Sequence, residues 1–335
     1  MRVLRFIVLL FALLVSPLYL QAAGVNLLPS VVFPSGGDDT QTLQTACNAN
    51  SENSIVELIA GQYNVSTVNC RNIVSQSTDA FFYYQGQQPS TKIKGFGGTT
   101  AVVTCQSPGP CAYRGFTIDP GPGQIGLQIG SNTHGVQLYD LSIIDDQGGG
   151  SSDCVRFPGN DNQNLVVRGG TYEHCGGWCF NMVENLSDSS WYLADIANCA
   201  NGGIFVGSGF GDTFVGNRIQ DQYGSPGVWI DGEQSNGGSG TIVFDGNIFD
   251  SNSSDIIVNN LYLVASGNMD CRVQVGGMFE FRGNVAINAS ANMSCGPTYL
   301  VDQGANVYGA IYDPFPSYAN DGGFSQSKLS GIVRQ

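Results

Sequence analysis

A short pattern recurs four times in this chain: an apolar residue, any residue, glycine and asparagine. It occurs at Phe214–Asn217, Phe244–Asn247, Ala265–Asn268 and Phe281–Asn284. Successive copies are 30, 21 and 16 residues apart, and each follows a short apolar run. Glycine gives the backbone freedom that a tight turn needs, and asparagine tolerates a left-handed conformation while bonding neighbouring backbone groups. The pattern predicts a coil of short strands whose turns accept insertions.

A second series of short runs alternates an apolar residue, any residue and another apolar residue. Its members are Leu127–Ile129, Val155–Phe157, Phe180–Met182, Ile204–Val206, Val228–Ile230 and Ile256–Val258. Short strands that wind in one direction form parallel sheets that stack rung on rung. We therefore predict an all-β fold, a single-stranded right-handed parallel β-helix. Because rungs stack about 4.8 Å apart, the asparagines of successive turns are expected to form a hydrogen-bonded ladder.

Composition limits the classes of partner. The formal charge is −14, and three of the 335 residues are lysine. This balance excludes nucleic acid and anionic membrane surfaces as expected partners. Charged residues are only 12% of the chain and glycines number 46, which is typical of one elongated domain with many turns and few helices.

Residues 1–23 have the pattern of a secretory signal peptide. Arg2 and Arg5 precede the apolar run Phe6–Val15, and small residues stand at Ala22 and Ala23. We expect a secreted, extracellular or periplasmic protein with no membrane insertion after signal cleavage. The predicted organisation is a cap and first strand over 24–60, a β-helix over 61–312, and a C-terminal tail or cap over 313–335; the oligomeric state is left open.

Ten cysteines, an even number, suit disulfides in an oxidising compartment. Proximity favours three pairs, Cys47–Cys70, Cys105–Cys111 and Cys271–Cys295. Two further pairings, Cys154 with Cys179 and Cys175 with Cys199, fit the predicted register. No cysteine spacing indicates a zinc site, so no metal ligands are predicted from the cysteines.

The segment Phe33–Ala46 carries the motif Gly37-Asp38-Asp39-Thr40, and Ser54–Tyr63 follows it with a strand and a Gly-x-Tyr turn. With these motifs, residues 31–312 resemble the pectin-lyase-like superfamily of right-handed β-helices. The resemblance implies a short N-terminal capping helix over the open end of the first rung. Asp38 or Asp39 is expected to cap that helix, and Leu43, Ala46 and Cys47 lie on one of its faces.

One branch of the superfamily, the polygalacturonase-like glycoside hydrolases, offers a more specific comparison. Ser152–Val155 resembles its Asp-Asp-Cys motif with one aspartate retained, and Asn217–Gln220 resembles its Arg-Ile-Lys run with glutamine for lysine. By register, Trp178 stands in place of the family histidine and Ile125 in place of an earlier aspartate. One carboxylate of three remains, so this route does not supply the acid and base that an inverting hydrolase needs.

The outward residues of one strand series combine amide, guanidinium and aromatic side chains. They are Gln128, Arg156, Asn181, Phe205, Trp229 and Ile257. Aromatic rings cover the apolar faces of sugars, while amides and guanidinium groups bond hydroxyls or carboxylates. We therefore predict that Arg156, Asn181, Phe205 and Trp229, with Trp178 beside them, bind a polysaccharide. The alternative is an ordinary solvated face.

Acidic residues and a histidine gather where rungs end. Asp145 and His174 fall in one column, Asp221 lies further along it, and Asp146, Asp153 and Glu173 are near. Neighbouring carboxylates shift each other's pKa and can divide acid and base roles. We take Asp145, Asp146, Asp153 and His174 as candidate catalytic residues. A Ca²⁺ site or a solvated turn is the alternative.

Two function classes follow. The first is a secreted enzyme, a polysaccharide hydrolase or lyase, that uses this carboxylate and histidine cluster. A lyase or uronate epimerase would need a base and a cation, either Arg156 or Ca²⁺, on the substrate carboxylate. The second is a non-catalytic glycan-binding or adhesin-type β-helix with the same outward residues. The lost family motifs favour the binder, but the convergent polar groups favour the enzyme, and we therefore predict the enzyme, with the glycan-binding β-helix as the alternative.

Overall fold

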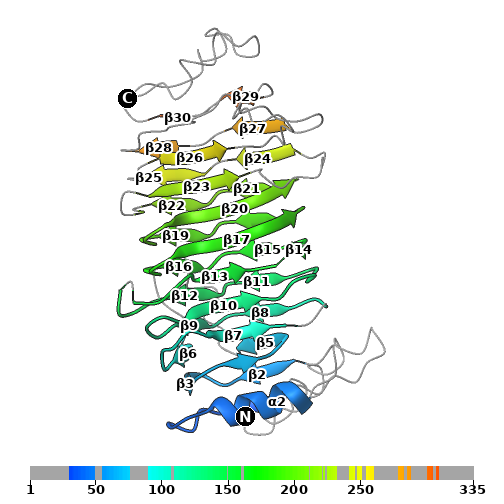
Figure 1. Cartoon of the computed structure of the whole chain (residues 1–335), viewed down its shortest axis with the longest axis vertical. Coiled ribbons are helices and arrows are strands. Elements are labelled where there is room, and N and C mark those ends of the chain that lie inside the picture. Colours follow the sequence, from blue (N-terminus) through cyan, green and yellow to red (C-terminus); the bar gives the residue numbers. More distant parts are fainter. Residues whose placement is uncertain are drawn as a thin grey trace, which may run out of the picture.

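A computed structural model describes most of the predicted coil. The described residues are 30–49, 55–75, 90–106, 109–148, 150–159, 162–210, 212–220, 222, 225–231, 241–245, 247–250, 254–259, 278–282, 285–287, 300–304 and 307–308. Short strands stack rung on rung, and a single described helix, α2 (Thr40–Ala49), lies at one end (Figure 1). The predicted signal peptide, the tail from Asp313, Asp221, Cys271 and Cys295 lie outside the described residues.

The described strands form three sheets, named A, B and C here, in which every pairing is parallel. Sheet A contains β1 (Ser30–Val32), β2 (Val56–Leu58), β5 (Asn72–Ser75), β8 (Ala112–Arg114), β11 (Gln137–Tyr139), β15 (Val166–Arg168), β18 (Ser190–Tyr192), β21 (Thr213–Val215), β24 (Thr241–Asp245), β27 (Met278–Arg282) and β29 (Leu300–Gly304). Sheet B contains β3 (Gly61–Val65), β6 (Thr91–Gly95), β9 (Thr117–Asp119), β12 (Ser142–Ile144), β16 (Thr171–Glu173), β19 (Asp195–Ala197), β22 (Arg218–Gln220), β25 (Ile248–Asp250), β28 (Val285–Ile287) and β30 (Val307–Tyr308). Sheet C contains β4 (Val68–Asn69), β7 (Ala101–Cys105), β10 (Ile125–Ile129), β13 (Val155–Phe157), β17 (Trp178–Ser187), β20 (Gly202–Phe210), β23 (Pro226–Asp231) and β26 (Ser254–Asn259), and β14 (Asn162–Gln163) pairs beside β17.

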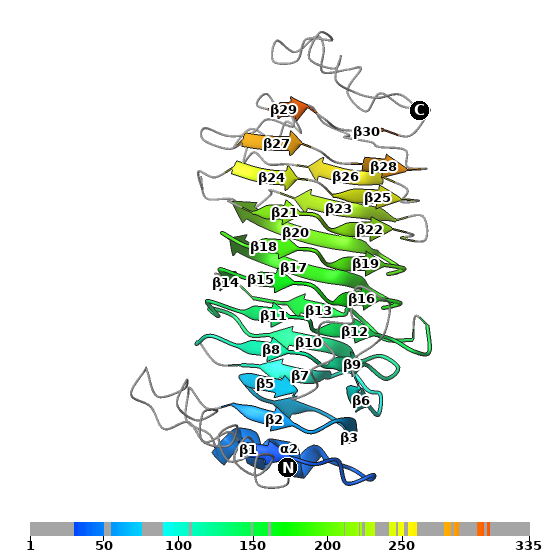
Figure 2. The same ribbon diagram turned by 180° about the vertical axis from the view of Figure 1, so that it is seen from behind.

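Each turn of the coil runs through sheets A, B and C in that order. In Figure 1 the strands β17 and β20 of sheet C lie in front and point to the right while the chain climbs. From behind, in Figure 2, strands β24 and β27 of sheet A lie in front and also point to the right. The coil is therefore right-handed, and the predicted right-handed parallel β-helix is confirmed.

Alternation along each strand sends one set of side chains into the core. In β13, Val155 and Phe157 are buried while Arg156 between them is partly exposed. Large rings fill the interior, where Trp191 and Phe214 stack with ring centroids 4.6 Å apart. Burying such a side chain stabilises the fold by about 1.5–3 kcal/mol, so each rung contributes to one continuous core.

The Gly-Asn turns form the predicted ladder where it is described. Gly216 has a φ of 63°, the left-handed conformation that glycine adopts without strain. Asn217 is not left-handed, contrary to the expectation for asparagine; its side chain instead bonds neighbouring rungs. Its Nδ2 donates to Asn247 Oδ1 (2.9 Å) and to the Trp191 carbonyl (2.9 Å), and its Oδ1 accepts from the Ala194 N–H (3.0 Å).

Helix α2 caps the first rungs through side chains that imitate a missing strand. Gln44 Oε1 accepts from the Asn69 N–H (2.9 Å), and Gln44 Nε2 donates to the Asn69 carbonyl (3.1 Å). At the start of the helix, Asp38 accepts from the Thr40 N–H (2.9 Å), while buried Asp39 accepts from the N–H groups of Ser35 and Asn64. The helix therefore covers the first edge of sheet C, as the family resemblance implied.

Within the described residues, no helix has the length and hydropathy to cross a membrane. In the described part of the coil four disulfides are present: Cys47–Cys70, Cys105–Cys111, Cys154–Cys175 and Cys179–Cys199. The first two confirm the predicted pairs.

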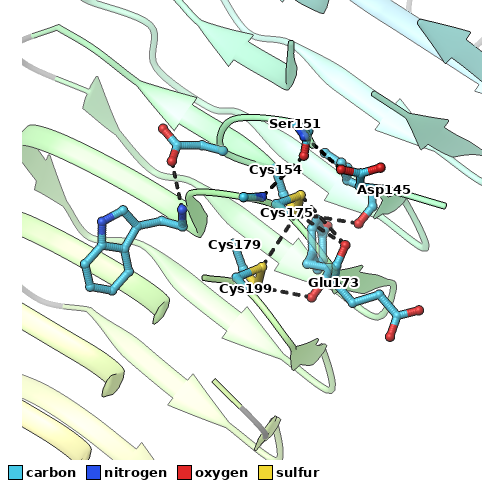
Figure 3. The surroundings of a disulfide bond; sticks show 12 residues. Asp145, Ser151, Cys154, Glu173, Cys175, Cys179 and Cys199 are labelled. Carbon is cyan, nitrogen blue, oxygen red and sulfur yellow. Dashed lines mark hydrogen bonds between the residues drawn. A yellow bond between two sulfur atoms is a disulfide. The ribbon is translucent and has the colours of Figure 1, made fainter. Parts of the chain in front are cut away.

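The pairing of Cys175 with Cys199 was wrong, and so was the pairing of Cys154 with Cys179. Cys154 and Cys179 share a register in sheet C, and residues in register on parallel strands hold their Cβ atoms about 4.8 Å apart, wider than a disulfide spans. Each strand-start cysteine instead bonds the turn cysteine of the next rung, with Cα atoms 5.6 Å apart in both bonds. Figure 3 shows the two bonds side by side, with the sulfurs of Cys154 and Cys199 3.9 Å apart.

A buried carboxyl group stands in the turn that leads from sheet C to sheet A. Asp212 is fully buried and its Oδ1 accepts from the Ser189 N–H (3.1 Å), while Oδ2 has no hydrogen-bond partner among the described groups. Burial raises the pKa of Asp212 well above the usual 3.8. The folded state therefore favours the protonated carboxyl.

We predict that the disulfides between rungs join turn to strand. Chymotrypsin cleaves after aromatic residues and so separates Cys175 from Cys179 by cutting after Trp178. Mass spectrometry of the non-reduced, alkylated digest should show peptides that link Cys154 to Cys175 and Cys179 to Cys199. Peptides linking Cys154 to Cys179 would contradict the structure.

We predict that Asp212→Asn stabilises the protein at about pH 7. The pKa of Asp212 is higher in the folded state than in the unfolded state. The stability that its protonated carboxyl group adds to the fold is therefore fully present below the unfolded pKa. As pH rises, this stability is lost by about 1.4 kcal/mol per pH unit until the folded pKa is reached. The denaturant midpoint of Asp212→Asn should exceed that of the wild type, and the gain should shrink towards about pH 4. Glu57→Gln, at a partly exposed carboxyl group on the outer face of sheet A, is the control; equal pH profiles for all three proteins would refute the prediction.

Candidate functional site

The outward residues of sheet C form two adjacent columns. Strand pairing places Gln128, Arg156, Asn181, Phe205 and Trp229 in register, one residue per rung. Three residues earlier along the chain on each of these rungs, a second column contains Asp153, Trp178, Gly202 and Pro226. The predicted substrate-binding residues thus lie together on one face, and all five are partly exposed. Ile257 continues the first column in β26.

Three aromatic side chains of this face contact one another. The ring centroids of Trp178 and Phe205 are 5.3 Å apart, those of Phe205 and Trp229 are 5.9 Å apart, and those of Trp178 and Trp229 are 6.2 Å apart. Trp178 lies over Gly202: a Cβ atom at Gly202 would stand 2.3 Å from the indole ring. We call Trp178, Phe205 and Trp229 the aromatic platform.

Asp153 organises the polar end of the same face. Its Oδ1 accepts from the Trp178 N–H (2.8 Å), and its Oδ2 accepts from Arg156 Nε (2.5 Å) and Asn181 Nδ2 (2.9 Å). The carboxylate is 2% exposed, whereas the Arg156 side chain is 33% exposed. Asp153 therefore lies beneath the face and orients three groups that reach its surface.

Both carboxylate oxygens of Asp145 also accept hydrogen bonds from backbone groups of the fold. Its Oδ1 accepts from the Gln147 N–H (2.9 Å) and its Oδ2 from the Ser151 N–H (2.8 Å), so the carboxylate closes the loop between sheets B and C (Figure 3). The residue is buried. The column predicted for Asp145 and His174 is present, because Ile144 pairs with Glu173 immediately before them. Asp145 and Asp153 therefore stand at opposite ends of one loop, the first after sheet B and the second before sheet C.

His174 occupies a turn position. Its φ is 63°, and Asn198, which follows β19 as His174 follows β16, has a φ of 56°. His174 is partly exposed beside Glu173. Burial raises the pKa of Glu173, His174 lowers it, and Asp195 and Asp146 raise it further. Glu173 is thus a partly exposed carboxyl group with a raised pKa, and Asp195, which is also partly exposed, has a pKa that burial raises in the same way.

The sequence analysis missed an ionic cluster on sheet B. Lys92 lies 3.7 Å and Lys94 3.6 Å from Asp119 Oδ2, Lys92 also forms an ion pair with Asp146, and the Asp146 N–H donates to Asp119 Oδ1 (3.3 Å). Burial and then the Asp146 charge raise the pKa of Asp119. The sequence contained a signal for this cluster, because two of its three lysines, Lys92 and Lys94, stand two residues apart. This cluster holds the loop that begins at Asp145 against sheet B.

The described carboxylates do not fit a Ca²⁺ site, which needs six to eight oxygen ligands. The oxygens of Asp145 and Asp153 are occupied by N–H donors, and the Lys92 ammonium lies between Asp119 and Asp146, where a cation would bind. Among the described residues, Cys154, Cys175 and Cys199 bring three sulfurs into metal-ligand range, but all three are in disulfides.

The segment that resembles the Arg-Ile-Lys run does not lie close to Asp153 in the three-dimensional structure. Arg218 lies in β22 of sheet B, whereas Asp153 precedes β13 of sheet C. The two polygalacturonase-like fragments are therefore on different sheets. Trp178, by contrast, stands one rung from Asp153 in the same column, as its register predicted.

No family model and no curated protein matches the chain. Solved structures with a similar course include the mannuronan C-5 epimerase AlgE4 A-module of Azotobacter vinelandii, at 14% identity and a TM-score of 0.49, covering 85% of this chain and 80% of that one. The surface adhesin PfbA of Streptococcus pneumoniae gives 13% identity and a TM-score of 0.45, covering 84% of each chain. Likenesses this distant identify neither activity nor ligand, so those are argued from the residues of this chain. On the strand topology and handedness described above, the chain has the right-handed parallel β-helix fold that the pectin-lyase-like superfamily resemblance implied.

Proposed function

We propose that this protein is a secreted glycan-binding β-helix whose ligand lies along the outer face of sheet C. The aromatic platform carries the proposal, because three partly exposed rings on neighbouring rungs form a continuous surface for the apolar faces of sugar rings. Asn181, on the same rung as Trp178, and Arg156, one rung earlier, continue the face and supply hydrogen bonds to hydroxyl groups.

The state of the carboxylates supports binding over catalysis at this face. A general acid or base must reach a substrate proton within hydrogen-bond distance. Asp153 is buried under three donors and Asp145 under two, so neither carboxylate is presented to a ligand. Asp153 instead acts as a positioning residue for the groups that are presented.

Export is part of the proposal. Residues 1–23 have the composition of a signal peptide, and the four described disulfides suit an oxidising compartment. We expect the protein to act outside the cell or in the periplasm, where polysaccharides are available as ligands.

A second candidate is a polysaccharide-cleaving enzyme whose acid is Glu173. The raised pKa of Glu173, its exposure and the nearby Asp146, Asp195 and His174 favour it over the buried aspartates. This site would lie at the end of strand β16 of sheet B, and the short connection 174–177 separates it from Trp178 of the aromatic platform. It is the less favoured function, because the structure shows no aromatic platform among the described residues around it.

For the binding function, we predict that Trp229→Ala and Phe205→Ala each weaken glycan binding about 10- to 100-fold, since each removes an aromatic contact worth about 1.5–3 kcal/mol. Binding would be measured by titration with the polysaccharide that the wild type retains from a panel of soluble and insoluble glycans. Tyr192→Ala, an aromatic substitution on the outer face of sheet A, is the matched control and should bind normally. Equal losses in all three variants, or none, would contradict the proposal.

For the enzyme alternative, we predict a loss of roughly 10²- to 10⁴-fold in cleavage rate for Glu173→Gln. Because the acid form is required and its pKa is raised, wild-type activity should decline as pH rises through that pKa. New reducing ends and the absorbance of unsaturated uronides distinguish hydrolysis from elimination. Glu57→Gln on sheet A is the control, and unchanged activity in Glu173→Gln would exclude this role.

A further inference from the structure

Asp153 sets the charge of the binding face. We infer that the ligand of the aromatic platform is an uncharged glycan and that Asp153 is the residue that excludes polyuronides. This inference rests on the proposed function, and it names the class of polysaccharide that the face selects.

The charge of the face carries the first step. Among the described side chains of the two outward columns of sheet C, Asp153 and Arg156 are the charged ones, and they form an ion pair with each other. The face is therefore neutral where a ligand would lie. The chain as a whole has a formal charge of −14, which repels a polyanion at longer range.

The orientation of Arg156 carries the second step. Arginine recognises carboxylates by donating two parallel hydrogen bonds from its planar fork. Here Nε donates to Asp153 Oδ2 (2.5 Å) and Nη2 donates to Ser152 Oγ (3.1 Å), so the chain itself occupies the edge of the guanidinium formed by Nε and Nη2. The remaining N–H donors belong to a cation whose charge is already neutralised by the Asp153 carboxylate, which is 2% exposed. A ligand carboxylate at that cation would add a second negative charge beside Asp153, whereas an uncharged hydroxyl would not.

Asn181 carries the third step. Its Nδ2 donates to Asp153 Oδ2 (2.9 Å), which fixes the amide so that its carbonyl oxygen Oδ1 remains as the acceptor. A sugar hydroxyl can donate to that oxygen, whereas a carboxylate placed directly against it would bring two acceptors together, so this position suits a hydroxyl group of the ligand. The same residue, Asp153, thus turns Asn181 towards hydroxyl groups and neutralises Arg156.

The test compares one set of ligands across three proteins. The ligands are uncharged hexasaccharides of the cello-, manno- and xylo-series, and oligogalacturonate and oligomannuronate of the same length. The wild type should bind at least one uncharged series and neither uronate. Asp153→Asn keeps the side-chain size, removes the charge and frees the guanidinium, so uronate affinity should rise roughly three- to tenfold. That gain should disappear at high salt and in the double variant Asp153→Asn with Arg156→Gln.

Asp188→Asn removes an exposed carboxylate elsewhere and controls for net charge alone; it should not gain uronate binding. Tight uronate binding by the wild type that is lost in Trp229→Ala would overturn this inference while leaving the binding face intact. Absence of binding to any of the glycans would instead overturn the proposed function. Should Asp153→Asn fail to fold, the selectivity of the wild type alone still decides between uncharged and anionic ligands.

Discussion

Parallel hydrogen bonding between successive rungs is the constraint on which the rest of this structure depends. It fixes the distance between rungs at about 4.8 Å and keeps residues of successive rungs in strict columns. Columns that point inward give the continuous core, with Trp191 stacked on Phe214. Columns that point outward repeat one position in space at a regular interval, which is the geometry that a linear polymer of similar repeating units can follow.

The same constraint creates problems at the ends and turns, and side chains resolve them. Gln44 completes the hydrogen bonds of the first edge of sheet C, and Asn217 satisfies the turn backbone between rungs. Asp145 performs a similar task in the loop that leads to Asp153. Buried polar groups need partners, and a carboxylate that satisfies backbone N–H groups is not available for chemistry on a ligand. This explains how a chain can retain aspartates at rung ends and still present a face suited to binding.

Sequence reasoning predicted what depends on register and missed what depends on the path of a turn. The column of Arg156, Asn181, Phe205 and Trp229 followed from strand alternation, because a parallel sheet preserves that order. The disulfide of Cys154 could not be assigned in this way, since Cys175 reaches it from a turn whose direction register does not specify. In the cluster of Lys92, Asp119 and Asp146, the lysines were a signal in the sequence, but the position of Asp146 over Asp119 depends on the loop that follows β12. The burial of Asp145 and Asp153 was likewise unpredictable, because it depends on which N–H groups the loop turns towards them.

Hydroxyl-radical footprinting with the bound glycan tests the central claim most directly, because it locates the ligand without any substitution. The account predicts that glycan reduces oxidation of Trp178, Phe205 and Trp229, while Tyr139 and Tyr192 on the outer face of sheet A react equally with and without it. Trp191, which is buried, should stay unreactive throughout. Protection on sheet A, or an unprotected aromatic platform in a protein that demonstrably holds its glycan, would contradict the assignment of the binding face to sheet C.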